Sequence, residues 1–485
     1  MDAGAFCSGF FYFYKMIRKI CFLIFLFLSV AELHAQKNNL FRYDSDYPDS
    51  SVYSGRRIEL RNKLPDNSVA IVFSAPVRNR STDVDYRYHQ NPDFYYLTGF
   101  TSSNSLLLIF KDNQSINGNF ANEFLFIPAR KKQKELWTGR MASVEDADEI
   151  SGIKSIINAC AFDTLFFDFE KFDKILFANL PVGMTDNKQD TCDLSDLVTS
   201  FKRKSQFPSP NGDSYILRKT LSGMREIKRE SELVLLRKAI SISCLGHIAM
   251  MKNLKPGMHE YEIQSVGEYV FRNKGAEDVG YPSICGGAEN SCILHYETNR
   301  RELKNGDLIL LDMGAEYHGY TADVTRTLPV GGKFSKEQKI IYNLVRQAQD
   351  SAFSMCKPGS EFHDPHKAAV SVIKKGLLDL GIIKDEKEFS QYFMHGTSHY
   401  LGLDVHDVGA FGALKAGNVI TIEPGIYITA DSPCDPKWWN IGIRIEDDVL
   451  ITATGYENLS GACPSNAADI EMLMKSSSSA PELIR

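Results

Sequence analysis

Three histidines and two aspartates lie within one sixteen-residue stretch, MHGTSHYLGLDVHDVG (Met394–Gly409). His395 and His399 have the i,i+4 spacing that zinc peptidases of the HExxH type also use. Gly396, however, stands where such an enzyme has its catalytic glutamate, so that mechanism is excluded. Taken alone, the spacing favours a metal site no more than a pair of hydrogen-bonded core histidines.

Two strand-like segments of similar sequence end in a carboxylate. GDLILLDMG (Gly306–Gly314) and GNVITIEPG (Gly417–Gly425) both read glycine, a polar residue, four mostly apolar residues, a carboxylate, one further residue and glycine. Asp and Glu are almost never fully buried unless they are paired or bind a metal. Because Asp312 and Glu423 occupy the same position, we predict two related halves that deliver carboxylates to one centre.

A second acid follows each of these segments, Asp323 in GYTADVTRTL and Glu446 in IGIRIEDDVLIT. A hairpin with its turn centred on Tyr317–His318 would set Asp312 directly opposite Asp323. Like charges in that arrangement repel each other unless a cation lies between them. The second hairpin has a longer loop, so we expect its two glutamates to pair but leave their register open.

Four carboxylates and one imidazole form a hard, oxygen-rich set of donors. Such a set suits Mn²⁺, Co²⁺, Fe²⁺ or Zn²⁺ better than Ca²⁺. It needs only one histidine, and the stretch Met394–Gly409 can supply it. Combined with the two hairpins, the histidine pair therefore indicates a metal centre.

The elements that must position these residues belong to the second of two domains, and two domains are expected for a chain of 485 residues. In the first part, strand-like runs alternate with helical segments, and this pattern predicts an α/β domain over residues 44–205. The runs are VAIVF (Val69–Phe73), SLLLIF (Ser105–Phe110) and EFLFIP (Glu123–Pro128).

The second domain is expected over residues 216–472. The stretch KRKSQFPSPNGDS (Lys202–Ser214) collects turn-forming residues and reads as the linker before it. Apolar residues at helical spacing predict a helix over Glu230–Leu254. The serine-rich residues 475–485 predict a disordered tail.

The N-terminal residues 1–35 have the order of a secretory signal peptide. Three basic residues precede the apolar run Ile20–Val30, and small residues follow, with Ala35 or Ala31 as the expected last residue removed. The run is too short for a membrane-spanning helix, which needs about 20 apolar residues. We therefore expect cleavage, export to the periplasm or the medium, and no stable membrane span afterwards.

The composition is that of an ordinary globular protein, with 43% hydrophobic and 24% charged residues. A net charge of -6 and the absence of any basic run exclude nucleic acid as an expected partner. The ten cysteines lie at scattered positions that specify no disulfide. We interpret those beyond the leader as small buried hydrophobic residues.

Taken together, these segments resemble aminopeptidase P, the Xaa-Pro aminopeptidases of the pita-bread metallopeptidase family M24. The resemblance covers Asp46 to Met474. It implies an N-terminal α/β domain followed by an α+β pita-bread catalytic domain of the creatinase/aminopeptidase type. It rests on YHQNPDFYYLTGF (Tyr88–Phe100), LWTGR (Leu136–Arg140), CILHY (Cys292–Tyr296), LLDMGAEYHGYTADVTRT (Leu310–Thr327), HGTSHYLGLDVHDVG (His395–Gly409), EPGIY (Glu423–Tyr427) and IGIRIEDDVLIT (Ile441–Thr452).

The resemblance implies the ligands of two divalent metal ions, which we expect to be Mn²⁺. Asp312 would bind one ion, His399 and Glu423 the other, and Asp323 and Glu446 would bridge the two. Two ions so arranged lower the pKa of a shared water, and the bridging hydroxide would attack the scissile carbonyl.

Four further residues are implied to be catalytic. His295, His395 and His406 match histidines that line the family's site and stabilise the tetrahedral intermediate, although each could instead be a hydrogen-bonded core residue. Arg444 is expected on the same strand face as Glu446, where its guanidinium can hold a bridging carboxylate or the substrate backbone.

The resemblance implies release of the N-terminal residue from peptides with proline in second position. The bond before proline is a tertiary amide without an N–H, so its cleavage needs carbonyl polarisation and a pocket for the ring. We expect Tyr427, His295 and His406 to form that pocket, although ordinary strand packing explains Tyr427 equally well.

The nearest alternative is prolidase, which shares the ligands but splits Xaa-Pro dipeptides. The segments NPDFYYLTGF and LWTGR favour the aminopeptidase. Methionine aminopeptidase lacks the large N-terminal domain, and creatinase has lost the ligand set. Non-catalytic pita-bread modules that bind histones or RNA have degraded ligands, whereas all five are present here. The expected partners are therefore Xaa-Pro peptides and, in a homo-oligomer, further copies of the chain.

Overall fold

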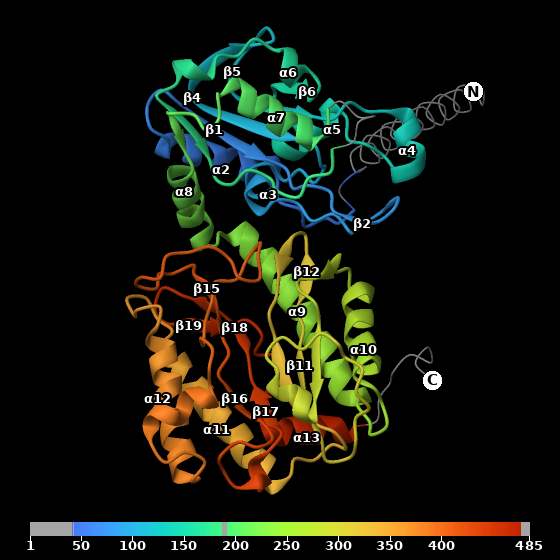
Figure 1. The fold of residues 1–485 in the computed structure, drawn as a ribbon, viewed down its shortest axis with the longest axis vertical. Coiled ribbons are helices and arrows are strands. Elements are labelled where there is room, and N and C mark those ends of the chain that lie inside the picture. The colour runs from blue at the N-terminus through green and yellow to red at the C-terminus, as the bar shows by residue number, and fades with distance from the viewer. Residues whose placement is uncertain (1–40, 42, 187–191, 477–485) are drawn as a thin grey trace, which may run out of the picture.

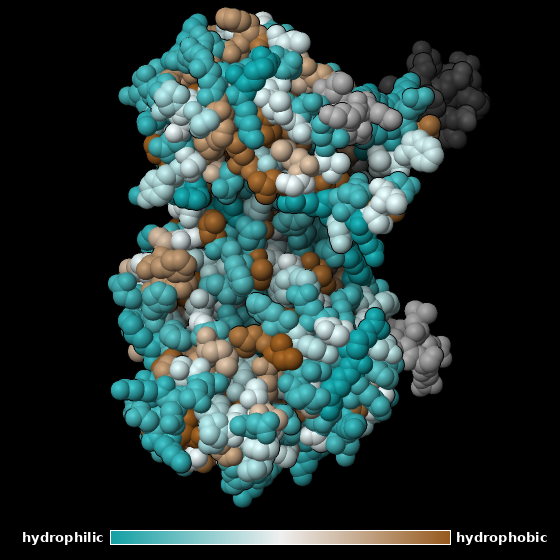
Figure 2. Space-filling model, viewed as in Figure 1, coloured by the Kyte–Doolittle hydropathy of each residue, from teal (hydrophilic) through white to brown (hydrophobic). Residues whose placement is uncertain are grey.

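The computed structural model describes residues 41, 43–186 and 192–476. They form two lobes, with the N-terminal part of the chain above and the C-terminal part below in Figure 1. The surface is hollowed at the waist between the lobes (Figure 2). The predicted signal peptide and all but the first two residues of the predicted tail lie outside the described residues.

A six-stranded mixed sheet in the order β6-β5-β4-β1-β7-β8 forms the centre of the N-terminal lobe. β1 is antiparallel to β4 and parallel to β7. The three predicted strands are confirmed as β1, β4 and β5. The bounds are β1 (Ser68–Phe73), β4 (Leu106–Ile116), β5 (Asn119–Ile127), β6 (Ile156–Asn158), β7 (Lys174–Phe177) and β8 (Gly212–Asp213), beside a hairpin of β2 (Asn79–Ser81) and β3 (Val84–Asp85).

Both faces of this sheet are covered, and for that reason β1 is apolar at every position but its first. Val69, Ile71 and Phe73 pack into one core. Ala70 and Val72 pack into another, which continues into the lower lobe and joins the two lobes. The helices of this lobe are α2 (Ser50–Lys63), α3 (Pro92–Thr98), α4 (Lys132–Thr138), α5 (Val144–Ser151), α6 (Ala161–Thr164), α7 (Leu194–Lys204) and a short turn η1 (Phe169–Lys171).

The predicted end of the first domain at residue 205 is too early. Residues 202–204 end α7, and the rest of the predicted linker returns to pair β8 with β7 as the edge of the sheet. The helix α8 (Tyr215–Glu226) then packs against β7 and α2 before the chain enters the lower lobe. The composition of this stretch predicted a linker, because β8 has only two residues and so short a strand leaves no pattern in the sequence.

The interpretation of the cysteines is wrong for one pair. Cys160, beside α6, forms a disulfide with Cys192, which lies two residues before α7. The six other cysteines among the described residues are free, and four of these are buried. The two cysteines are 32 positions apart in the sequence, which explains why their spacing gave no signal.

The lower lobe consists of two halves, each with a pair of helices followed by short antiparallel sheets. In the first half the sheets have the orders β10-β11-β14 and β13-β12-β9, and in the second β15-β18-β19 and β16-β17. The helices are α9 (Glu230–Asn253), α10 (Glu260–Asn273), α11 (Lys336–Phe353), α12 (Asp364–Asp379) and α13 (Ala467–Lys475), with short turns η2 (Ala288–Cys292), η3 (Glu386–Gln391) and η4 (Pro436–Trp438).

The strands of the two halves correspond in order. Those of the first half are β9 (Asp278–Val279), β10 (Ile284–Gly287), β11 (Leu308–Asp312), β12 (Ala315–Tyr317), β13 (Tyr320–Thr321) and β14 (Thr325–Pro329). Those of the second half are β15 (Val419–Ile422), β16 (Gly425–Ile428), β17 (Ile441–Arg444), β18 (Asp447–Ile451) and β19 (Tyr456–Asn458).

The glycines that open the two similar segments confirm the predicted repeat. Gly306 has a φ of +92° and Gly417 a φ of +93°, a conformation that only glycine adopts easily. Gly306 donates its N–H to the carbonyl of Val330, directly after β14, and Gly417 donates its N–H to the carbonyl of Ile451, the last residue of β18. The two halves therefore begin their carboxylate strands from the same backbone geometry.

The predicted helix over Glu230–Leu254 is confirmed as α9. It is long and apolar enough to cross a membrane, but most of its apolar window is buried inside the lobe. Among the described residues no other helix has that length and composition. The position of α9 is therefore that of a core helix.

Candidate metal centre

One cavity of about 480 Å³ in the lower lobe brings the five predicted ligands together. Asp312 is the last residue of β11, and Asp323 lies between β13 and β14. Glu423 follows β15 directly, and Glu446 lies between β17 and β18. His399 comes from the segment that pairs alongside β15. The four acids therefore stand at or next to the end of a strand, and all five residues meet at the junction of the two halves.

The predicted pairing of Asp312 with Asp323 is wrong by two residues. Asp312 pairs with Thr325, and the turn is centred on His318–Gly319. Both turn residues have positive φ, at +48° and +78°, as a tight hairpin turn requires and as glycine allows. A shift of two keeps both aspartates on one face of the hairpin as diagonal neighbours.

In the second half the two glutamates stand opposite each other. The β16–β17 ladder ends with Gly425 opposite Arg444, and the β15–β18 ladder begins with Ile422 opposite Asp447. The same register places Glu423 across from Glu446.

Thr325 joins the two halves at the centre. Its hydroxyl donates to Glu446 Oε2 at 2.6 Å, and its carbonyl accepts the N–H of Glu446 at 3.1 Å. The carboxylates of both hairpins are thereby held at one place.

His399 is the histidine that faces the carboxylates. Its Nε2 lies 3.3 Å from Asp323 Oδ2 and 3.5 Å from Glu423 Oε1. Its Nδ1 lies 3.0 Å from the carbonyl of Tyr400, which can only accept a proton, so Nδ1 carries the hydrogen. Nε2 is thus directed at the acids. Asp323, His399 and Glu446 offer donor atoms that all lie within 4.8 Å of one another.

The segment His395–His399 is not helical, although an i,i+4 spacing of two histidines would place them on one face of a helix. It is extended: Glu423 donates its N–H to Thr397, and Thr421 donates to His399. Side chains four apart share a face in an extended segment as they do in a helix, so both histidines still reach the cavity.

The charges of this cavity fit bound cations. Burial raises the pKa of Asp312 and of Glu446, and it raises that of Glu423 to about 7, while the neighbouring acids add to each of these shifts. Burial lowers the pKa of His399, but Asp323 and Glu423 outweigh it and raise that pKa to about 9.

Carboxylates that are buried close together destabilise one another's ionised forms unless a positive charge lies beside them. The four carboxylates and one imidazole are the donors that divalent ions prefer, and this donor set fits two such ions.

His295, His395 and His406 all line the cavity. His395 Nε2 lies 2.8 Å from the hydroxyl of Tyr427, and burial with the nearby Arg444 lowers the pKa of His395 to about 3. The ring of His406 stands edge-on against that of His399, with 4.4 Å between the centroids. None of the three takes part in the cluster of metal-capable donors formed by the described residues.

Arg444 holds a different carboxylate from the one expected. Its guanidinium pairs with Asp312 Oδ2 and donates to the Tyr427 hydroxyl at 2.9 Å, whereas Glu446 takes its hydrogen bond from Thr325. Asp312 rather than a predicted bridging acid is therefore fixed by Arg444.

Tyr427 does not line the cavity, so the expected contact with a proline ring is wrong. The side chain is 1% exposed and packs against Ile284 and Leu310 behind the wall. Its hydroxyl links His395 to Arg444. The residues that form the apolar part of the wall, missed from the sequence, are Pro282, Ile284, Leu294 and Val405.

Tyr281 is a further residue that sequence reasoning missed. Its hydroxyl lies 2.6 Å from Asp312 Oδ1 and 2.5 Å from Asp323 Oδ1, so one proton is shared between two carboxylates. The surrounding segment VGYPS has no strand pattern, and no motif in it indicates a site residue.

We expect Tyr281→Phe to weaken metal binding or turnover by about 10- to 100-fold, the usual effect of losing a hydrogen bond to a ligand. Equilibrium dialysis with Mn²⁺ and steady-state kinetics check this. Tyr342→Phe is the matched control, because that buried hydroxyl donates to the Ser465 carbonyl outside the cavity. Equal metal affinity together with equal turnover in the two variants would contradict the expectation.

Comparisons with known proteins show the family to which both lobes belong. The family model of Metallopeptidase family M24 matches residues 234–453, and that of the Aminopeptidase P N-terminal domain matches residues 53–175. The Xaa-Pro aminopeptidase of Escherichia coli (strain K12) is 34% identical over 435 residues, which cover 87% of this chain and 97% of that protein. The Xaa-Pro aminopeptidase of Haemophilus influenzae is 36% identical and covers 87% and 96%.

Solved structures of similar proteins share the whole arrangement. A variant of Escherichia coli aminopeptidase P in complex with substrate has a TM-score of 0.78 at 33% identity, covering 88% of this chain and 98% of that chain. Aminopeptidase PepP of Pseudomonas aeruginosa has a TM-score of 0.78 at 34% identity, with the same coverage. The similarity therefore includes both lobes.

Proposed function

Because this chain belongs to metallopeptidase family M24 and is an enzyme of the Xaa-Pro aminopeptidase type, we propose that it releases the N-terminal residue from peptides with proline in second position, using hydroxide generated at two divalent ions. Members of this family use divalent metal ions, and we propose Mn²⁺ here. The observation that carries the proposal is the convergence of four carboxylates and His399 in one cavity.

The ligands we propose are Asp312 for one ion, His399 and Glu423 for the other, and Asp323 and Glu446 as bridges. When bound, the ions would polarise the scissile carbonyl and lower the pKa of a water between them toward neutrality. The chain's own groups orient these ligands. Tyr281, Thr325 and Arg444 each hold a carboxylate oxygen, which leaves its other lone pairs free for a cation.

The three histidines of the wall have different parts, and two of them can reach the substrate. At neutral pH His395 is uncharged and is tied to Tyr427 and to the carbonyl of Gly396, so it shapes the cavity. His406 is exposed at the cavity and can donate an N–H to the oxygen of the carbonyl under attack. His295 is also exposed on the wall and can contact the substrate there.

Proline in second position suits this cavity for a chemical reason. The bond before proline has no N–H, so a peptidase that holds its substrate by that donor cannot bind it. This cavity offers charge to polarise the carbonyl and an apolar wall of Ile284, Leu294 and Val405 to receive the ring.

We expect the Mn²⁺-loaded enzyme to cleave Xaa-Pro-Yaa peptides with a kcat/KM about 10- to 200-fold above that for Xaa-Ala-Yaa, the range that apolar ring contacts provide. The kcat/KM for each peptide is measured from the amount of first residue released, which amine derivatisation and chromatography quantify. Leu294→Ala, which removes part of the apolar wall, should narrow the ratio.

Equal kcat/KM for the proline and alanine peptides would contradict the proposed specificity. An assay with the Xaa-Pro dipeptide distinguishes the aminopeptidase from a prolidase. Hydrolysis of the dipeptide but not of the tripeptide would indicate a prolidase.

We further propose that the protein is exported and forms a homo-oligomer. The leader-like residues 1–35 support export, and so does the Cys160–Cys192 disulfide, since such bonds persist in oxidising compartments. The exposed Leu136 and Trp137 support self-association, because apolar side chains so open to water are typical of contact surfaces. Cell fractionation and light scattering measure these two properties.

A further inference from the structure

A loop of the lower lobe separates the metal cavity from a second cavity at the junction of the lobes. Val405 and His406 line the metal cavity. Asp404 and Val408 line the second, which has a volume of about 530 Å³ and is otherwise lined largely by the N-terminal lobe. Asp404 and Val408, two residues before and two residues after His406, therefore face the other lobe.

Arg225, near the end of α8, contacts three carboxylates at this junction. Its Nη1 lies 2.7 Å from Oδ1 of Asp93, in the first turn of α3 of the N-terminal lobe. Its Nη2 lies 2.8 Å from Asp404 Oδ2 and 2.5 Å from Asp407 Oδ1, both in the loop. The arginine side chain is 4% exposed, and its partners Asp407, Asp93 and Asp404 are 2%, 20% and 43% exposed, so water screens the pair with Asp407 least.

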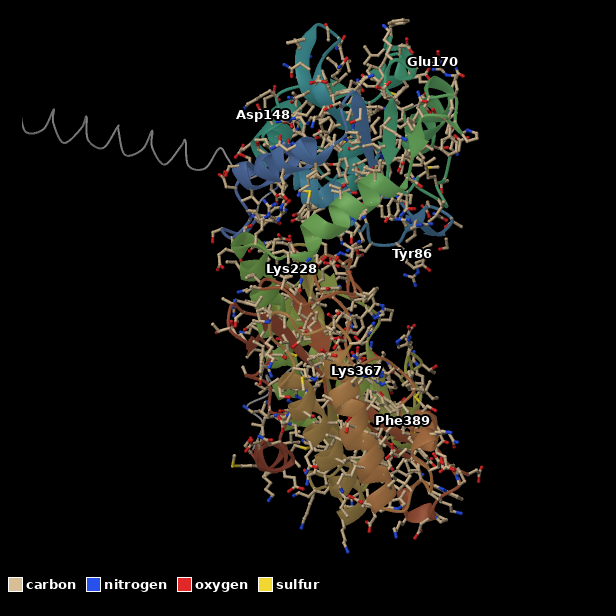
Figure 3. All side chains as sticks on the ribbon, turned by 90° about the vertical axis from the view of Figure 1, so that its left-hand side faces the viewer. Tyr86, Asp148, Glu170, Lys228, Lys367 and Phe389 are labelled. Carbon is tan, nitrogen blue, oxygen red and sulfur yellow. A yellow bond between two sulfur atoms is a disulfide. The ribbon has the colours of Figure 1, made fainter. Side chains whose placement is uncertain are left out.

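Lys228 completes the cluster from the short connection between α8 and α9. Its Nζ lies 2.9 Å from Asp407 Oδ2, and the lysine and aspartate side chains are 1% and 2% exposed. Lys228 is labelled in Figure 3, where it lies at the meeting of the two lobes. Two cations thus face three carboxylates, with Arg225, Lys228 and Asp407 buried at the centre and Asp404 at the exposed edge.

The cluster fixes the loop on both sides of His406. Asp404 is held before it and Asp407 directly after it, and the N–H of Asp407 donates to the Tyr400 carbonyl at 2.8 Å. With both flanking carboxylates held, the backbone that carries Val405 and His406 has little freedom to shift.

We propose that Arg225 is a positioning residue for the reaction, which ties the N-terminal lobe through Asp93 to the loop that presents His406 to the substrate. This inference rests on the proposed role of His406. It gives the N-terminal lobe a part in catalysis, because the placement of a group in the metal cavity then depends on the seating of that lobe.

The guanidinium is needed for its shape as well as its charge. A planar fork can contact Asp93 with one nitrogen and the two loop aspartates with another, whereas a lysine ammonium is a single point on a flexible stem. Arg225→Lys keeps the charge that the buried acids require and loses the fork.

We expect Arg225→Gln to lower kcat by about 10²-fold, the effect of misplacing a reacting group by about 1 Å, with metal content unchanged. KM should change much less than kcat, because the substrate's other contacts stay in place. Arg225→Lys should restore the thermal stability of the protein more than it restores kcat. Asp93→Asn, which removes only the N-terminal arm, should lower kcat by a smaller factor and serves if Arg225→Gln does not fold.

Arg229→Gln is the matched control. Arg229 also spans the two lobes, to Glu59, but the pair is about one-third exposed and touches no part of the loop. This variant should keep the kcat of the parent enzyme. A loss in Arg229→Gln equal to that in Arg225→Gln would show a general effect of loosening the lobes and would overturn the inference.

A double-mutant cycle with His406→Ala tests the route directly. If Arg225 acts through His406, Arg225→Gln should lower kcat far less in the His406→Ala background than in the parent. Equal fold losses in both backgrounds would overturn the inference and leave the role of His406 intact. An unchanged kcat in His406→Ala alone would instead overturn that role, and the inference with it.

Discussion

Replacing Asp323 or Glu446 by alanine should reduce peptide hydrolysis by about 10³-fold or more, since the transition-state stabilisation supplied by bound metal amounts to several kcal/mol. Each side chain is proposed to bridge both ions, and its loss would leave two cations facing each other without a shared anion. The variants should also purify with less metal, which elemental analysis measures.

Glu471→Ala provides the control for these two variants. Glu471 is a mostly buried carboxylate of the same lobe, paired with Lys339 and outside the cavity. Its loss should cost some stability and leave metal content and kcat near those of the parent. Full metal content together with full activity in Glu446→Ala would contradict the ligand assignment.

We expect His399→Ala and His406→Ala to lose activity for different reasons, the first by losing metal and the second with its metal retained. His399 directs Nε2 at Asp323 and Glu423, so its loss should lower metal content and activity together. His406 contributes no donor to that cluster, and its loss should keep the full metal content. Removal of one donor to a developing oxyanion typically costs about 10²- to 10³-fold in kcat, and we expect that for His406→Ala.

Metal analysis of the two histidine variants, purified side by side, separates these expectations from the reverse assignment. Unchanged metal in His399→Ala with a loss in His406→Ala would show that the metal nitrogen belongs to the other histidine. His395→Ala supplies an internal comparison, since that ring is bound to Tyr427 and should not affect metal content.

The acids were predictable from sequence because a buried strand that ends in a carboxylate is costly and therefore informative. Asp312 and Glu423 were identified in this way, and the positive φ of both Gly306 and Gly417 confirms that their strands correspond. The register of the first hairpin was missed because the turn is set by backbone conformation at His318–Gly319, which the pairing of charges does not report.

Other features depend on contacts between distant segments, which spacing along the chain does not encode. The shared proton of Tyr281, the disulfide between Cys160 and Cys192, and the return of Gly212–Asp213 to the first sheet are of this type. Tyr427 was placed in the substrate pocket on resemblance, whereas packing against Leu310 puts its ring behind the wall. The ion cluster at Arg225 likewise joins residues more than a hundred positions apart.

The central claim is that divalent metal in this cavity drives release of the residue before proline. The most direct measurement is hydrolysis of an Xaa-Pro-Yaa peptide by protein stripped with chelator and then titrated with Mn²⁺, with bound metal measured in the same samples. We predict no release without metal and recovery of activity as the metal content rises toward two ions per chain. Undiminished turnover in the metal-free protein would contradict the account.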